Sequence, residues 1–209
     1  MFYATGISTD FGYLRLLSDA EMLLGAELGG LSLDREGQES LKAGEMQEAE
    51  RMLLLRKKKR SFLENAEMEA VWIADGDAED IAPLKTALSW YRAYFSGEQP
   101  DPYAVPLRLC GSPFQEEVWE IVRGIPYGQV LSYGEIAHVI AARRGIPRMA
   151  AQAVGGAVGK NHFSILIPCH RVLGADGAMV GYGCAPGSLE QKRALLLHEG
   201  VLWAPDAPE

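Results

Sequence analysis

The 209-residue chain has little cysteine and no long apolar run, and both absences limit what it can be. Its three cysteines, Cys110, Cys169 and Cys184, include no CxxC pair, which excludes a disulfide framework. No stretch of 18 apolar residues occurs, which excludes a membrane-spanning helix, and the start MFYATGISTDFG lacks the pattern of a secretory signal. We therefore expect a cytoplasmic protein (nuclear in a eukaryote) without a membrane partner.

Basic residues are also few: the chain has 20 Lys and Arg but 28 Asp and Glu, which gives a net charge of −8. Over the whole chain this balance disfavours nucleic acid as a partner, because phosphates are bound by clustered cations. The acidity is uneven, however. Residues 1–104 carry eleven basic and nineteen acidic side chains, whereas residues 105–200 carry nine and seven. The second half therefore permits a nucleic-acid surface, although low acidity does not by itself show one.

The glycine and proline residues of the stretch 97–106 predict a domain boundary. Before this stretch, two β-prone runs at 2–7 and 13–17 flank a turn, and an amphipathic pattern at 84–95 predicts a helix. Together these patterns indicate a small N-terminal domain over residues 1–104.

A second helical pattern lies inside the N-terminal half, at about residues 38–69, and predicts an insertion in that domain. It contains the basic run 56–60. Such a run is either a nuclear address or phosphate contact, or the solvated face of a helix whose neighbours are acidic.

Residues 105–209 form the second expected domain. Three helices are predicted there, at residues 114–122, 132–142 and 148–158. Ser132 and Glu135 form a capping box that starts the second of them. The last two helices, joined by a turn that contains glycine, indicate a helix-turn-helix. The third helix is rich in Ala and Gly, which suits either close packing on another helix or entry into a minor groove.

The candidate chemistry follows the apolar run 164–167, which predicts a buried strand. Cys169 and His170 come next, and such a pair is either a nucleophile with its base or a buried thiol beside a histidine. Successive side chains of an extended segment point to opposite faces, so these groups meet only if the backbone turns after Pro168 or a water bridges them. Glu199 is available to orient the histidine. The histidines do not pair with cysteines at ligand spacing, so no metal site is expected.

The segment Ile167-Pro-Cys-His-Arg-Val172 resembles the active-site signature of the methylated-DNA–protein-cysteine methyltransferases, which repair O6-alkylguanine. Further motifs recur at the family's order and spacing over about residues 107–200: FQ and VW within 114–119, IPYG at 125–128, SYGEIA at 132–137, AVGG at 153–156, Asn161, and LLHEG at 196–200. The resemblance implies an α+β protein. A small N-terminal α/β domain of RNase H-like type would precede a mostly helical winged helix-turn-helix domain.

The resemblance also implies a mechanism. A monomer would bind alkylated double-stranded DNA and flip out O6-alkylguanine, or O4-alkylthymine as a further substrate. Cys169 would take the alkyl group and keep it as a thioether, so the protein would act once and need no cofactor. His170 would accept the thiol proton through a water, with Glu199 holding the histidine. Tyr133 would donate a hydrogen bond to the flipped base, and Asn161 would brace the turn that carries the cysteine.

Two further sets of residues follow from the resemblance. The residues expected to bind DNA are Tyr133, Arg148, Ala151, Gln152, Ala153, Gly155 and Arg171. The residues expected to line the substrate pocket are Tyr133, Tyr182, Gly183, Cys184 and Lys192. Gln152 departs from the family, where an arginine fills the hole left by the flipped base, so base flipping is expected to be weaker unless Arg148 stands in. The loop at 182–189 is about three residues longer than usual, so the resemblance does not fix which alkyl groups are accepted.

Two other functions are compatible with the sequence. One is a helix-turn-helix protein that recognises alkylated DNA with little transfer activity, although relatives of that kind lack the acceptor cysteine that this chain has. The other is a Cys-His-Glu hydrolase, which would turn over repeatedly and would not need the Ala-rich helix.

Overall fold

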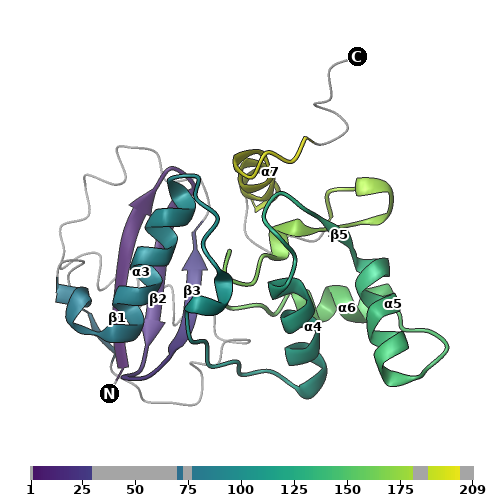
Figure 1. Ribbon diagram of the computed structural model, residues 1–209, viewed down its shortest axis with the longest axis horizontal. Helices are drawn as coiled ribbons and strands as arrows, with labels where there is room; N and C mark the ends of the chain where they lie inside the picture. The colour runs from purple at the N-terminus through teal and green to yellow at the C-terminus, as the bar shows by residue number, and fades with distance from the viewer. Residues whose placement is uncertain (1, 30–69, 73–76, 181–187, 203–209) are drawn as a thin grey trace.

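The computed structural model describes residues 2–29, 70–72, 77–180 and 188–202 (Figure 1). The expected insertion at 38–69, with its basic run 56–60, lies outside these residues. The described part is α+β, as the resemblance implies, with one four-stranded sheet, five α-helices and a two-stranded pair. None of the helices in it is long and apolar enough to cross a membrane.

The sheet contains the two strands that the sequence predicts and two more. Its strands are β1 (Phe2–Thr9), β2 (Gly12–Ser18), β3 (Leu23–Leu28) and β4 (Ala70–Trp72), in the order β3-β2-β1-β4. The first three form antiparallel pairs, and β4 runs parallel to β1. Along β2 the side chains alternate, and Leu14 and Leu16 point into the core. The β1–β2 turn closes where the Thr9 hydroxyl bonds the Gly12 carbonyl at 2.7 Å.

Helix α3 (Ala82–Phe95) covers one face of this sheet and contacts β2 and β3 (Figure 1). It confirms the helix predicted at 84–95. Its buried stripe includes Leu84, Leu88 and Tyr91, as the helical spacing requires. The helix ends at Phe95 with Ser96 as its C-cap, and Gly97 follows with φ +89°, a conformation that glycine adopts without strain.

The second half of the chain is mostly helical. Its helices are α4 (Pro113–Arg123), α5 (Tyr133–Arg144), α6 (Ala151–Val158) and α7 (Ser188–His198). The strands β5 (Leu131–Ser132) and β6 (Val172–Leu173) form a parallel pair. The 3₁₀ turns within the described residues are η2 (Asp77–Asp80), η3 (Pro102–Ala104), η4 (Cys169–Arg171) and η5 (Ala175–Gly177). Helices α4, α5 and α6 pack on one another (Figure 1).

Local capping explains where helix α5 begins. Ser132 accepts from the Glu135 backbone at 3.1 Å, and the Glu135 carboxylate accepts from the Ser132 backbone at 2.6 Å. This is the capping box that the sequence predicts. By contrast, α6 begins at Ala151 and not at 148, so the predicted start is three residues too early. Residues 148–150 belong to the connection between α5 and α6. Helix α6 packs on both α4 and α5.

The two halves share a continuous core and are joined along β3. The Ala26 amide donates to the His162 carbonyl, and the Ser164 amide donates to the Ala26 carbonyl, both at 2.8 Å. The Tyr91 hydroxyl of α3 also bonds the Ser164 carbonyl at 2.5 Å. The segment just before Cys169 is therefore held against the N-terminal sheet and helix.

The apolar run 164–167 is not the predicted strand. It forms turns, with the Leu166 amide bonded to the Ser164 carbonyl and the Ile167 amide bonded to the Phe163 carbonyl, both at 2.9 Å. Ile165 adopts φ +69°, which is uncommon for a β-branched residue. The sequence pattern predicted burial correctly, since Ile165, Leu166 and Ile167 are all buried. An apolar run of four residues indicates burial but does not distinguish a strand from a buried turn.

Candidate active site

The backbone turns immediately after Pro168. A turn here is one of the two alternatives, beside a bridging water, that would let the Cys169 and His170 side chains act together. The Cys169 amide donates to the Ile167 carbonyl at 2.8 Å, and the Arg171 amide donates to the Pro168 carbonyl at 2.9 Å. These bonds form the short turn η4. The segment therefore leaves the extended conformation at Cys169.

The side chain of Asn161 braces this turn. Its Nδ2 donates to the Ile167 carbonyl at 2.8 Å and lies 3.4 Å from Cys169 Sγ, while its Oδ1 accepts from the Phe163 amide at 2.9 Å. Asn161 thus connects the two ends of the turn to the sulfur, as the resemblance implies.

His170 and Glu199 form a fully buried pair, with His170 Nε2 at 2.7 Å from Glu199 Oε1. Arg171 binds the same carboxylate through Nε at 2.8 Å and Nη2 at 2.9 Å, and the Gly128 amide approaches Oε2 at 3.3 Å. Burial alone would raise the pKa of Glu199, but the hydrogen bonds and charges of His170 and Arg171 hold it well below its usual range. Glu199 is therefore an anion that fixes the imidazole.

The environment of His170 favours the neutral ring. Burial lowers the pKa of His170 below its usual value, although the bond and charge of Glu199 oppose this shift. With Nε2 directed at the carboxylate, the neutral tautomer carries its lone pair on Nδ1. Nδ1 is buried and has no hydrogen-bond partner among the described residues. His170 thus has the form of a base that can accept one proton.

The thiol of Cys169 is not strongly activated in the absence of substrate. Burial raises the pKa of Cys169, while the hydrogen bond from Asn161 and the positive charge of Lys192 oppose the shift. Lys192 is fully buried, and its Nζ donates to the carbonyls of Val172 at 2.7 Å and Val180 at 3.2 Å. Burial lowers the pKa of Lys192 to about 8. Because the thiol form is favoured, a base is needed to take the proton.

Tyr133, at the start of α5, lies on the helical side of the site. Burial and the nearby Cys169 raise the pKa of Tyr133 to about 12, so its hydroxyl is a donor at neutral pH. It lies 3.4 Å from the Val180 carbonyl, which Lys192 also binds. Gly155 of α6 faces the Tyr133 ring, and a side chain there would contact it at 3.8 Å. The structure therefore brings Tyr133, Lys192 and α6 together around Cys169. The remaining expected pocket residues, Tyr182, Gly183 and Cys184, lie outside the described part.

Helix α6 presents small residues to solvent. Ala151, Gln152 and Ala153 are exposed, whereas Val154 and Ala157 pack into the core. Arg148 is exposed just before this helix. The expected DNA-binding residues other than Arg171 thus gather at α6 and the start of α5 (Figure 1).

The position of Arg171 does not favour the DNA contact expected of it. Its side chain is almost fully buried, and its guanidinium is used by Glu199 and by the Ile125 carbonyl, which Nη1 contacts at 2.5 Å. Three of its five donors are thus used inside the protein, and its burial keeps the guanidinium away from a phosphate on the surface. Arg171 instead belongs to the cluster that holds Glu199.

Sequence reasoning missed one member of this cluster. Tyr94, from α3, donates its hydroxyl to Glu199 Oε1 at 2.7 Å. In the sequence it only completes the apolar stripe of the helix. A signal was nevertheless present, since a fully buried tyrosine needs a partner for its hydroxyl.

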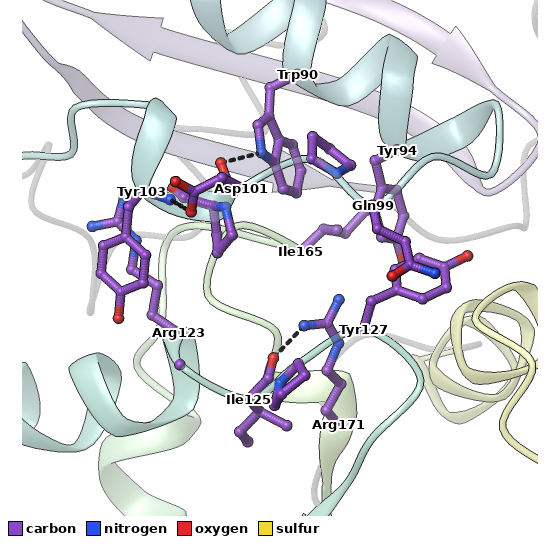
Figure 2. A pocket seen from close by; sticks show the side chains of 14 residues that line it. Trp90, Tyr94, Gln99, Asp101, Tyr103, Arg123, Ile125, Tyr127, Ile165 and Arg171 are labelled. Atoms are coloured by element: carbon purple, nitrogen blue, oxygen red, sulfur yellow. Dashed lines mark hydrogen bonds between the residues drawn. The ribbon is translucent and has the colours of Figure 1, made fainter.

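A pocket of about 230 Å³ lies behind the cluster, between α3, the connector at 99–103 and residues 123–127 (Figure 2). Figure 2 shows Tyr94, Tyr127 and Arg171 at its rim. Among the described residues, no group of three or more His, Cys, Asp or Glu side chains could hold a metal ion.

Comparison with known proteins identifies the family. Residues 113–201 match the model of the "6-O-methylguanine DNA methyltransferase, DNA binding domain" family. The methylated-DNA–protein-cysteine methyltransferase of Mycolicibacterium paratuberculosis is 48% identical over 124 residues, which are 59% of this chain and 70% of the relative. The chain belongs to this methyltransferase family. The resemblance drawn from the sequence motifs is thereby confirmed.

Other relatives of the methyltransferase family give the extent of the match. The protein of the same name from Mycobacterium leprae is 46% identical over 110 residues, which are 53% of this chain and 61% of the relative. The chain thus spans about three fifths of that curated relative. The crystal structure of Mycobacterium tuberculosis OGT in complex with DNA is 32% identical, with a TM-score of 0.61, over 97% of this chain and 96% of that one. The methyltransferase fold therefore extends over both halves of the chain.

Proposed function

We propose that this protein repairs DNA by moving the alkyl group of O6-alkylguanine to Cys169 in a single, irreversible turnover. The buried Glu199–His170 pair beside a thiol of raised pKa is the observation that carries the proposal. Relatives bear the name methylated-DNA–protein-cysteine methyltransferase, and a related OGT is described in complex with DNA.

The proposed reaction uses each group for one step. Glu199 holds Nε2 of His170, so Nδ1 accepts the thiol proton of Cys169 through a water. The sulfur attacks the alkyl carbon, a C–S bond forms, and the C–O bond breaks with its electron pair kept on the guanine oxygen. Tyr133 donates a hydrogen bond to the departing base, which reduces its charge. The thioether does not revert, so each molecule acts once.

The DNA would reach this site through the small residues of α6. We propose that α5 and α6 form the helix-turn-helix of a winged-helix domain over residues 105–209, with α6 entering the minor groove. The exposed Ala151, Gln152 and Ala153 allow close approach of the helix, and Arg148 can reach a phosphate or the gap left by the flipped base. A helix with few cations implies modest affinity with a shallow salt dependence.

The N-terminal part, residues 1–104, we propose to be a scaffold domain of RNase H-like type. The sheet order β3-β2-β1-β4, with antiparallel β1 to β3, a parallel β4 and helix α3 across one face, supports this type. We further propose a cytoplasmic monomer without a cofactor.

Incubation with a duplex that carries one O6-methylguanine tests the function. The intact mass should rise by one methyl in place of the thiol hydrogen, stoichiometrically, and the change should map to the Cys169 peptide. Cys169→Ala should abolish it, whereas Cys110→Ala, which removes another thiol, should retain it. Tight binding of the duplex without a mass change would overturn the proposal in favour of recognition alone.

A further inference from the structure

Three donors from both halves of the chain converge on one oxygen of Glu199. Oε1 accepts from His170 Nε2 at 2.7 Å, from Arg171 Nη2 at 2.9 Å and from the Tyr94 hydroxyl at 2.7 Å. The first two lie next to Cys169 in the sequence. Tyr94 lies in α3, on the N-terminal sheet, and its side chain is 1% exposed. The anion that orients the imidazole is therefore held in part from outside the second half of the chain.

We propose that Tyr94 is a positioning residue for alkyl transfer, which fixes the Glu199 carboxylate and moderates the strength of its bond to His170. This inference rests on the proposed function, because it assigns Tyr94 a role in proton removal from Cys169.

The location of Glu199 explains why it needs such support. It follows directly after the last residue of α7, where backbone bonds are fewest. Tyr94 binds this helix end twice, because its hydroxyl reaches Glu199 and its carbonyl lies 2.8 Å from His198 Nε2. The ring centroids of Tyr94 and His198 are also 5.2 Å apart. Helix α3 thus holds both the His198 side chain at the end of α7 and the Glu199 carboxylate that the proposed relay depends on.

The Tyr94 ring is itself held firmly. It stacks on Trp90 at 5.7 Å and meets the edge of Tyr127 at 6.0 Å. Figure 2 shows Tyr94 and Arg171, from different halves of the chain, on the same pocket. A hydroxyl on so constrained a ring has little freedom to leave Oε1 for another acceptor.

The hydroxyl also affects how basic the carboxylate is toward His170. Burial and the charge of Glu199 raise the pKa of Tyr94 far above its usual value, so it is a permanent donor. A donor on Oε1 draws charge away from the bond to His170 Nε2. The titratable and charged groups around the Glu199–His170 pair are Tyr94, Tyr127, Cys169, Arg171, Lys192 and His198. Among these, only Tyr94 and Arg171 share Oε1 with His170 in the described contacts.

Tyr94→Phe tests the proposal, because it keeps the stacked ring and removes only the hydroxyl. With one donor fewer, Oε1 binds the imidazolium more strongly, so the pKa of His170 should rise. The acid limb of the single-turnover transfer rate should move up by roughly half a pH unit or more. The rate on the plateau above that limb should also fall by about tenfold, because the carboxylate that orients His170 loses a hydrogen bond to a charged group. Tyr127→Phe is the matched control, since its hydroxyl bonds the His198 carbonyl at 2.9 Å and not Glu199.

A second variant gives the opposite sign and keeps both the aromatic ring and its hydroxyl. Trifluorotyrosine at position 94 is a stronger donor, so it should move the acid limb to lower pH and preserve folding. The same acid limbs should appear when Cys169 of the folded protein reacts with iodoacetamide, which needs no DNA. The extent of this reaction is read from the Cys169 peptide after digestion. Acid limbs that stay in place in both variants, or a shift in Tyr127→Phe equal to that in Tyr94→Phe, would overturn the role of Tyr94. Shifts in the iodoacetamide profile without any alkyl transfer from DNA would instead overturn the proposed function alone.

Discussion

The side-chain amide of Asn161 lies 3.4 Å from the sulfur of Cys169 and holds the carbonyl of Ile167, two residues earlier, at 2.8 Å. One amide therefore sets both the shape of the turn and the polarity around the thiol. Among the groups that oppose the raised pKa of Cys169, this hydrogen bond has the largest effect.

Replacing this amide should make Cys169 less reactive. In Asn161→Ala the sulfur loses a donor and the Ile167 carbonyl loses its partner, so the pKa of Cys169 should rise further. We expect alkylation of the Cys169 peptide by iodoacetamide at pH 7 to slow by about tenfold, the effect of one pKa unit. Cys110 in the same digest is an internal reference, and an unchanged ratio of the two rates would contradict this role of Asn161.

The pH dependence of transfer should follow His170 and not a preformed thiolate. Because burial lowers the pKa of His170 below its usual value of 6.5, the acid limb of the transfer rate should lie below pH 6.5, and the rate should be flat between pH 7 and 8. In His170→Gln the base is lost, so the rate should drop by about a hundredfold or more at pH 7. It should then rise with pH as the thiolate of Cys169 forms. A flat profile in His170→Gln would show that another group removes the proton.

Much of the fold could be predicted because it depends on local chemistry. The Ser132–Glu135 capping box needs only two side chains three residues apart, and the stripe that begins at Leu84 needs only helical spacing. The sequence does not decide whether the backbone turns at Cys169, and the strand that it predicts at 164–167 is a series of turns in the structure. These turns are stabilised by contacts with Ala26 and Tyr91, which no local pattern reveals.

The candidate site divides in the same way. Cys169, His170 and Glu199 were found through motifs, and the structure brings His170 and Glu199 into contact. The resemblance places Arg171 among the residues that bind DNA, whereas in the structure its guanidinium binds the buried carboxylate of Glu199. Tyr94 is 105 positions away from its partner Glu199, so only the packing of α3 against the end of α7 reveals their contact.

Gln152 should limit how well the damaged base is held outside the helix. It lies exposed on α6, where an arginine would bring charge and a larger stacking surface to the gap. Gln152→Arg should therefore tighten binding of an O6-methylguanine duplex by about threefold to tenfold, corresponding to about 1 kcal/mol. The measurement is a titration at fixed salt concentration, in a Cys169→Ala background that prevents transfer.

Ala151→Arg controls for added charge, because it places the same cation one residue away on the exposed face. It should strengthen binding of alkylated and unmodified duplexes equally, whereas Gln152→Arg should favour the alkylated one. Equal gains on both duplexes in Gln152→Arg would show that position 152 does not fill the gap.

The buried, charged Lys192 should lower the free energy of unfolding at neutral pH, and this destabilisation should disappear at alkaline pH, where the folded chain holds the neutral amine. Its pKa is about 8 in the folded chain and about 10.4 when unfolded. Below pH 8 both states carry the charge, so the cost of burying it is fully present. Between pH 8 and 10.4 the unfolded state binds more protons, so the free energy of unfolding rises with pH through this range.

The change should reach roughly 2 to 3 kcal/mol by pH 10, because each pH unit between the two pKa values contributes about 1.4 kcal/mol. Comparison with Lys192→Met isolates it, because the other groups that titrate in alkali are common to both proteins. Urea unfolding at pH 7 and pH 10 should show the wild-type chain gaining stability over Lys192→Met at the higher pH. Lys160→Met, at an exposed position, is the control for removing a lysine. The quantity to compare is the rise in the wild-type free energy of unfolding from pH 7 to pH 10, measured relative to each variant. If this rise is no larger relative to Lys192→Met than relative to Lys160→Met, burial of the Lys192 ammonium does not destabilise the fold.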